Sequence, residues 1–243
     1  MSLTPVKKSV VQALVGSFET GRARPDYGAV SILNDRAGIS YGRFQATDRA
    51  DTLDLIVHRY VDLGGTLGTD LRPFLDDLDR DFTTKVDPAN LSQSAKDLMD
   101  LLRRAGTDPA MHAAQDQVFD EAYWVHCEGQ CNAMEIELPL SWAAVFDVVV
   151  QSGPGGVGII RRRFPELPPV KGGNEIRWAL AFMRARRDWI ASFVSSFKEP
   201  AYKARHEALV RKTVYRADAL LLLAEVGNWD LKPPFLARGV TIQ

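Results

Sequence analysis

Apolar residues recur along most of the chain at intervals of three or four, the spacing that places them on one face of an α-helix. The first such segment begins at Pro5. Thr4 is typical of a helix N-cap, and Pro5 is typical of the first helical position. The same reasoning predicts helices over residues 5–18, 51–63, 71–78, 92–104, 109–133, 141–151, 158–163, 174–197 and 202–225. The chain is therefore expected to be mainly α-helical.

Two further segments depart from this pattern. Residues 29–34 and 39–44 alternate or run apolar on either side of the Gly-containing turn "DRAG", which indicates a β-hairpin. Residues 141–151 are almost wholly apolar and end at "SGPGG", which indicates a central buried helix with a sharp stop. The residues after the last helix, "GNWDLKPPF", are expected to be extended. A two-lobed, mainly α domain with one small β-sheet or hairpin fits these segments.

Composition narrows the class of protein. The chain has 243 residues, of which 46% are hydrophobic and 25% charged, and its formal net charge is -1. Such a chain has no strong global field that would draw it onto nucleic acid or an anionic membrane. No segment is long and apolar enough to span a membrane. We expect no nucleic-acid partner, no membrane insertion and a monomer.

The N-terminus and the cysteines add two more expectations. The first residues lack a convincing small-residue cleavage site, so we interpret them as the first helix of the mature fold rather than a signal peptide. A protein made in the cytoplasm would then reach an extracellular or periplasmic substrate by non-classical export, injection or lysis. Cys127 and Cys131 do not complete a metal-ligand set with His126, so we expect two reduced thiols, no metal and no cofactor.

Two carboxylates near the N-terminus form a candidate catalytic pair. Glu19 ends the first helical pattern beside Phe18, and Asp35 lies in the predicted hairpin turn. Glycoside hydrolysis needs one protonated carboxyl group and one ionised carboxylate across the scissile bond. Apolar neighbours favour Glu19 as the acid, and a polar turn near Arg36 favours Asp35 as the base. Ser40, on the returning strand, can help to hold the attacking water.

The same two residues also have an ordinary structural interpretation. Aspartate is common in turns because it hydrogen-bonds nearby backbone groups, and a glutamate at a helix end is commonly a surface residue. From their spacing alone, both interpretations of Glu19 and Asp35 stay open.

Five segments together resemble the chitosanases of glycoside hydrolase family 46, which share the lysozyme-like two-lobed α fold. The segments are Glu19 followed by "DRAGISYG" (35–42), "DTLDLIVHRYVDL" (51–63), "FDVVVQSGPGG" (146–156), "GGNEIRWALAFMRARRDWI" (172–190) and "GNWDLKPPF" (227–235). Their order and spacing carry the resemblance. It implies one mainly α (α+β) domain, residues 1–243, with a small β-sheet and with the substrate cleft between its two lobes.

The resemblance also implies roles for single residues. It makes Glu19 the general acid and Asp35 the general base of an endo-acting, inverting hydrolase of β-1,4 linkages in an amino-sugar polymer. Ser40 takes the place of a water-positioning hydroxyl residue, usually threonine. Asp51 falls where the family has an acidic residue that binds a substrate amine, and the other candidates for substrate binding are Arg36 and Tyr41. The residues that match a buried ion network behind the acid are Asp147, Arg186 and Arg216.

One departure from the family leaves the substrate open. The family has a second acidic amine-binding residue about two helical turns after the position of Arg186, where this chain has the apolar "WIASFVSSF" (189–197). A cationic polymer needs acidic subsites. Peptidoglycan therefore stays an alternative substrate, for a muramidase or lytic enzyme delivered without a signal peptide. A lytic transglycosylase, which needs only the glutamate, and a non-catalytic glycan-binding module are further alternatives.

Overall fold

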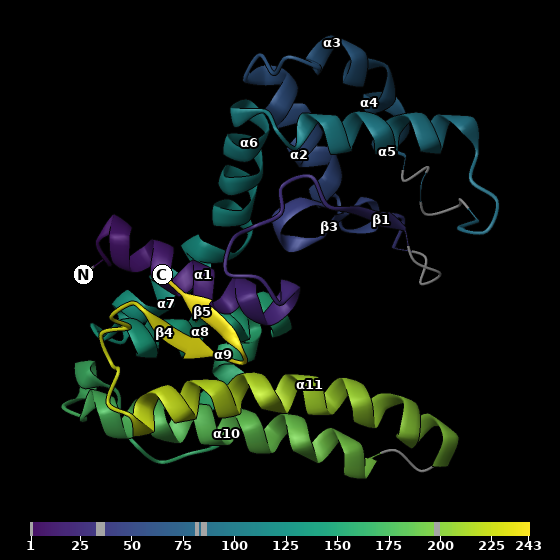
Figure 1. Ribbon diagram of the computed structural model, residues 1–243. Coiled ribbons are helices and arrows are strands. Elements are labelled where there is room, and N and C mark those ends of the chain that lie inside the picture. The colour runs from purple at the N-terminus through teal and green to yellow at the C-terminus, as the bar shows by residue number, and fades with distance from the viewer. Residues whose placement is uncertain (1, 33–36, 81–82, 84–86, 197–199) are drawn as a thin grey trace. The chain divides into compact units, whose positions relative to one another are not determined.

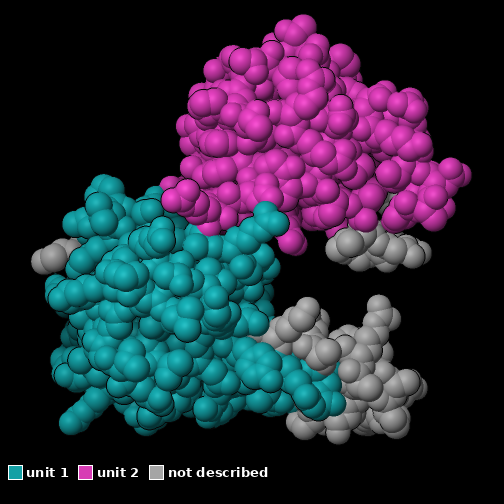
Figure 2. All heavy atoms as spheres, in the orientation of Figure 1, with its two compact units in different colours: residues 1–23, 123–243 teal, residues 24–122 magenta. Residues whose placement is uncertain are grey.

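The computed structural model describes residues 2–32, 37–80, 83, 87–196 and 200–243, without the side chains of 194–206, 208, 209 and 212. The chain forms two compact units. Unit 1 combines residues 1–23 with residues 123–243, and unit 2 is the continuous stretch 24–122 (Figure 2). Two units agree with the expected pair of lobes, while the cleft between them stays a prediction.

Unit 1 is built around one apolar helix. Its elements are α1 (Pro5–Thr20), α7 (Val125–Ala133), α8 (Pro139–Ser152), α9 (Pro154–Arg161), α10 (Glu175–Ser196), α11 (Pro200–Glu225), β4 (Phe235–Ala237) and β5 (Val240–Ile242). Helix α8 contacts α1, α7, α9, α10 and α11, and the long helices α10 and α11 lie side by side (Figure 1). Strands β4 and β5 pair antiparallel, with Leu236 opposite Thr241.

Helix α8 is buried over most of its length. Every side chain from Pro139 to Val149 is buried, as expected for a helix that is apolar on all sides. Asp147 is its one ionisable residue in that stretch, with an exposed fraction of 0%. Among the described residues, no single helix has the length and apolarity to cross a membrane; only α8 and α9 taken together do, and they are bent by 118°.

Unit 2 packs short helices against a small sheet. Its elements are β1 (Val30–Ile32), β2 (Ile39–Tyr41), β3 (Ala46–Thr47), α2 (Thr52–Asp62), α3 (Gly68–Leu71), α4 (Leu75–Leu78), α5 (Gln93–Ala105) and α6 (Pro109–Phe119). The sheet order is β1-β2-β3, all antiparallel, with Ser40 opposite both Ser31 and Thr47.

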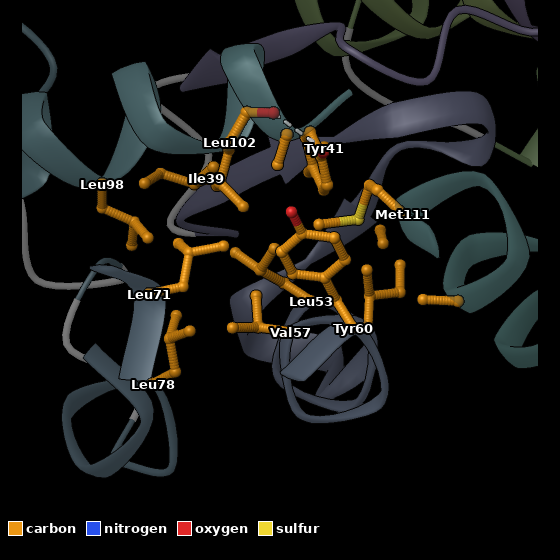
Figure 3. Packing of buried hydrophobic residues seen from close by; sticks show 14 of the residues in the cluster. Ile39, Tyr41, Leu53, Val57, Tyr60, Leu71, Leu78, Leu98, Leu102 and Met111 are labelled. Carbon is orange, nitrogen blue, oxygen red and sulfur yellow. Dashed lines mark hydrogen bonds between the residues drawn. The ribbon is translucent and has the colours of Figure 1, made fainter. Parts of the chain in front are cut away.

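The core of unit 2 follows the helical periodicity of its sequence. Leu53, Val57 and Tyr60 of α2 are spaced three or four residues apart and are fully buried. They form one cluster with Leu98 and Leu102 of α5, with residues of β2 and with others (Figure 3). Burial of such side chains contributes roughly 1.5–3 kcal/mol each.

The mainly helical fold with a small antiparallel sheet is confirmed, and the differences lie in details. The helix expected over 109–133 contains a π-helical turn, Asp120–Trp124, between α6 and α7. The helix expected over 71–78 is divided into α3, a 3₁₀ turn and α4. Strand β3 and the β4–β5 hairpin were not expected. Arg238 and Gly239 have φ of 50° and 80°, so the second hairpin turns through two left-handed residues.

Candidate active site

Glu19 lies at the C-terminal end of α1. The helix stops because Gly21 adopts a φ of 69° and donates its N–H to the carbonyl of Ser17 at 2.9 Å. This left-handed cap suits glycine, which has no Cβ to clash. The side chain of Glu19 is 38% exposed, while the preceding Phe18 is buried. The end of the helix therefore presents one carboxyl group to solvent beside an apolar interior.

Arg216 of α11 connects Glu19 to α8. One end of its guanidinium donates to Oε1 of Glu19, and its Nε donates to Oδ1 of Asp147 at 2.7 Å. The guanidinium carbon lies 5.6 Å from the centre of the Phe18 ring. Arg216 is only 4% exposed. A planar guanidinium with fixed donors can hold two carboxylates in one arrangement.

Arg186 of α10 holds the other side of Asp147. Its Nε donates to Oδ2 of Asp147 at 3.2 Å, and its Nη1 donates to Oγ of Ser152 at 3.3 Å. Its Nη2 donates to the side-chain oxygen of Gln151. The resulting chain, Glu19–Arg216–Asp147–Arg186, has two negative and two positive groups. We call these four residues the ion network.

Burial and pairing act in opposite directions on the pKa values of the network. Burial alone would raise the pKa of Asp147, but Arg216 and Arg186 outweigh it and hold the pKa below its usual range. Burial lowers the pKa of Arg186, and Asp147 opposes that change. Burial would also lower the pKa of Arg216, but Asp147 and Glu19 raise it overall. Asp147 therefore stays ionised because it is paired on both sides.

A pocket of about 370 Å³ opens beside Glu19 within unit 1. Its polar side chains include Gln151, which donates from Nε2 to Oγ1 of Thr213 at 2.9 Å. The residues that line it are Ser17, Phe18, Glu19, Thr20, Gly21, Gln151, Thr213, Arg216, Arg238 and Val240. A carboxyl group held by arginine at a polar pocket can donate or accept a proton on a bound molecule.

Tyr123 also lies within electrostatic reach of Glu19. Burial, and then the negative charge of Glu19, raise the pKa of the Tyr123 phenol. Tyr123 belongs to the π-helical turn Asp120–Trp124. Such turns occur frequently at functional sites.

The remaining sequence candidates belong to unit 2. Asp35 and Arg36 lie outside the described residues. Ser40 is at the centre of β2 and is 7% exposed. Asp51 is exposed at the start of α2 with a φ of 54°, and its side chain makes no capping hydrogen bond. Its carboxylate is therefore not used to begin the helix that it precedes.

Tyr41 corrects one expectation. Its side chain is fully buried, and its hydroxyl donates to the carbonyl of Leu102 at 2.9 Å (Figure 3). A ring enclosed in the unit 2 core cannot stack on a polysaccharide. The expected substrate contact is wrong because Tyr41 lies on the strand face that packs against α5.

Aromatic residues occupy the part of α10 where the family that the sequence resembles has a second acidic residue. Trp189 and Phe193 pack edge to face with their ring centres 4.9 Å apart. Phe193 is 39% exposed, and the guanidinium of Arg163 lies 5.8 Å from the Trp189 ring. The described part of this segment thus offers aromatic surface and a cation rather than a carboxylate.

Sequence reasoning missed four residues near Glu19. Gln151 and Ser152 follow Asp147 by about one helical turn, and a polar end to an apolar helix was the available signal. Arg238 was detectable as part of an Arg-Gly pair between two short apolar runs, which is a hairpin signal. No sequence pattern indicated Tyr123, because the apolar periodicity that predicted a helix over residues 109–133 showed no visible break at the π-helical turn.

The fold and the site together indicate a class of enzyme. A mainly helical protein with a small antiparallel sheet, and with a helix-end glutamate tied to a buried ion network, has the features expected of a carboxylate-dependent glycoside hydrolase. The family model "Glycosyl hydrolase family 46" matches residues 13–235. The chain belongs to glycosyl hydrolase family 46 and is a glycoside hydrolase.

Relatives and solved structures agree with this placement. A chitosanase of Bacillus subtilis (strain 168) is 25% identical over 240 residues, which cover 96% of this chain and 82% of the relative. A chitosanase of Gynuella sunshinyii in complex with chitotetraose superposes with a TM-score of 0.76 at 24% identity, covering 99% of this chain and 98% of that one. A mutant chitosanase of Bacillus subtilis MY002 complexed with 6 GlcN superposes with a TM-score of 0.75 at 23% sequence identity. The superposition covers 98% of this chain and 96% of that one. These two likenesses show the shared fold.

Proposed function

We propose that the protein is an endo-acting, inverting hydrolase of β-1,4 linkages in an amino-sugar polymer, with chitosan as the first candidate. The observation that carries the proposal is the ion network that ends at Glu19, in a chain of family 46. Relatives named as chitosanases, one of them in complex with chitotetraose, support the choice of polymer.

Glu19 is the proposed general acid. Arg216 binds Oε1, which fixes the orientation of the carboxyl group, and the partly exposed side chain can reach a bound sugar. In the reaction, Glu19 in its protonated form would give that proton to the glycosidic oxygen as the bond to the anomeric carbon breaks. The ion network contributes a fixed position for this group at no cost in reorganisation.

Asp35 is the proposed general base, and Ser40 the residue that positions water. An ionised Asp35 would take a proton from water as the water attacks the anomeric carbon from the face opposite the leaving group. Ser40 supports this role because its backbone is paired with strands on both sides, which fixes where its side chain begins, and 7% of the residue is exposed. Inversion requires carboxyl groups roughly 6.5–9.5 Å apart, with the water between them.

Asp51 is the proposed binding residue for a substrate amine. Its carboxylate is exposed and does not cap α2. An ammonium group of glucosamine next to such a carboxylate gains a charge-assisted hydrogen bond. Arg36 stays a candidate for substrate binding beside Asp35.

Peptidoglycan is the second candidate substrate, and one observation favours it. The partly exposed Trp189–Phe193 pair with Arg163 nearby suits the apolar face and the anionic groups of an acetylated cell-wall glycan better than a polyamine. The reaction and its residues would be the same.

The decisive experiment compares substrates and variants side by side. The purified protein and its Glu19→Gln, Asp35→Asn and Glu128→Gln variants are incubated with soluble chitosan and with peptidoglycan sacculi, and released reducing ends are measured. We expect cleavage of chitosan, with losses of at least about 10²-fold for Glu19→Gln and Asp35→Asn. Glu128 is partly exposed on α7 and belongs neither to the ion network nor to the pocket lining, so Glu128→Gln should match the unmodified chain.

Each outcome has a defined meaning. If only sacculi are cleaved, the proposed acid and base still stand, and the substrate is peptidoglycan instead of chitosan. Cleavage that persists in Glu19→Gln would remove Glu19 from its role. If neither substrate is cleaved in a Glu19-dependent way, the protein is a glycan-binding module or acts on another glycan.

A further inference from the structure

Asp54, His58 and Asp79 form a cluster in unit 2 that has no part in the proposed reaction. Asp54 and His58 are four residues apart on α2, so their side chains share one face of that helix. Asp79 directly follows α4. One donor atom from each residue lies within 4.8 Å of the other two. Two separate segments of the chain thus bring one imidazole and two carboxylates together.

The distances within the cluster match those between neighbouring ligands of a metal ion. Nε2 of His58 lies 3.2 Å from Oδ1 of Asp54 and 3.1 Å from Oδ1 of Asp79. Zinc binds imidazole nitrogen and carboxylate oxygen at about 2.0–2.2 Å, so ligands at tetrahedral angles are about 3.3–3.5 Å apart. The two distances from Nε2 of His58 are within a few tenths of an ångström of that spacing, and the Asp54 and Asp79 oxygens lie within 4.8 Å of each other.

The cluster has two carboxylates but one imidazole nitrogen that faces both of them. Nε2 of His58 makes its hydrogen bond with Asp79. Oδ1 of Asp54 lies 3.2 Å from the same Nε2 but makes no hydrogen bond with it. Two carboxylates that share one donor are incompletely paired. A cation bound by all three residues would pair with both carboxylates at once.

Access and local charge also suit a cation. The side chains of His58 and Asp79 are 42% and 50% exposed, whereas that of Asp54 is 18% exposed. An ion can therefore enter from solvent and keep a bound water. The guanidinium of the neighbouring Arg80 hydrogen-bonds Oδ1 of Asp77 at 3.0 Å, while its charge also acts on Asp79.

We propose that Asp54, His58 and Asp79 form a binding site for a divalent transition-metal ion of the zinc type, which joins α2 to the end of α4. One imidazole with two carboxylates suits zinc, cobalt or manganese, whereas calcium prefers oxygen ligands alone. Three protein ligands leave a position for water. The site does not depend on the proposed function, because none of its residues has a role in the hydrolysis.

Zinc binding by the intact protein tests this site directly. The protein is freed of metal with a chelator and equilibrated by dialysis with zinc chloride, and bound zinc is measured per chain. We expect one equivalent for the unmodified chain, and a higher melting temperature when zinc is present. His58→Ala and Asp79→Asn each remove a ligand. Their loss of affinity should exceed the roughly 10- to 100-fold caused by losing an outer-shell partner.

Two control variants remove the same kinds of side chain elsewhere. His126 is exposed on α7 and Asp76 is exposed on α4, so His126→Ala and Asp76→Asn should keep one equivalent of zinc. Cobalt gives a second readout, since its visible absorption should appear with the unmodified chain and be absent with His58→Ala.

The proposal fails on either of two results. Absence of zinc binding by the unmodified chain would show that the three side chains interact only with one another. Undiminished binding by His58→Ala and Asp79→Asn would place the zinc elsewhere. Circular dichroism of each variant establishes that a loss of binding does not reflect a loss of fold.

Discussion

At the scale of single residues, Arg216 is the residue that holds the carboxyl group of Glu19, because it hydrogen-bonds that group, whereas the local sequence pattern indicated only the apolar Phe18 as its neighbour. The guanidinium contacts both the Glu19 carboxyl group and the Phe18 ring. Because Arg216 is itself fixed by Asp147, the position of Glu19 depends on a residue that no substrate touches. Variants of Asp147 should therefore affect activity through the orientation of Glu19, the proposed acid.

Tyr41 allows a direct test of its placement in the core. In Tyr41→Phe, the hydrogen bond to the carbonyl of Leu102 is lost, but that carbonyl still accepts the N–H of Gly106 at 3.0 Å. We expect the free energy of unfolding to fall by about 0.5–1.5 kcal/mol. The KM for chitosan should not change. If Tyr41→Phe raised the KM for chitosan without lowering the free energy of unfolding, Tyr41 would be a substrate contact and not a core residue.

The residue-level predictions succeeded where the signal was local. The end of α1 was readable because a glycine follows Glu19 closely, and the helix does end there. The burial of Tyr41 was not readable, since a tyrosine on a three-residue strand faces either core or solvent according to packing. The contact between Glu19 and Arg216 joins residues 197 positions apart, which no pattern within one helix reports.

At the scale of elements, the ion network joins α1, α8, α10 and α11. In Asp147→Asn the two buried arginines lose their shared carboxylate. Removing one member of a buried ion pair costs about 3–5 kcal/mol, so we expect a loss of that size at neutral pH by chemical denaturation. Asp188→Asn, an exposed change on α10, is the control and should lie within about 0.5 kcal/mol of the unmodified chain.

The same variant has a predictable dependence on pH. Burial opposes ionisation of Asp147, but the two arginines hold its pKa below the usual value. A group with a lowered pKa in the folded state stabilises the fold fully above the ordinary range of aspartate, about pH 4, and this contribution is lost as pH falls through the folded-state pKa. The advantage of the unmodified chain over Asp147→Asn should shrink only below that range. A constant difference down to acid pH would contradict this.

The junction between α5 and the segment before β1 depends on two glycines. A Cβ at Gly106 would lie 2.3 Å from the Cα of Gly28, and backbone cannot move aside as a flexible side chain can. We expect Gly106→Ala to lower the free energy of unfolding by about 1–3 kcal/mol. Gly129 in α7 has open space around it. Gly129→Ala is therefore the matched control and should stabilise the protein by about 0.5–1 kcal/mol. Equal effects of the two would disprove the close approach.

Elements were predictable in proportion to their length. The long helices α1, α5, α8, α10 and α11 were identified within a few residues, because their periodic patterns extend over three turns or more. Strands β3, β4 and β5 have two or three residues, too few for an alternating pattern to be distinguished from a loop. Register in such short strands is determined by the rest of the fold.

At the scale of the whole molecule, the proposed acid belongs to unit 1, whereas the proposed base lies in the continuous sequence of unit 2. The anomeric form of the product tests whether they act as a pair across a water molecule. Proton NMR during hydrolysis of a β-linked oligomer should show the α-anomer first. A β-anomer would indicate a covalent intermediate, and an anhydro sugar would indicate a lytic transglycosylase.

The division of the chain into units also bears on how the protein is made. Unit 2 is one continuous stretch, so all of it is synthesised before α8 and α11. Helix α1 is synthesised before α8, on which it packs, and Glu19 must wait for Arg216, which is added 197 residues later. The nascent chain therefore contains Glu19 long before it contains the residues that orient its carboxyl group. The cell that synthesises this hydrolase meets an assembled ion network only after α11 has been made.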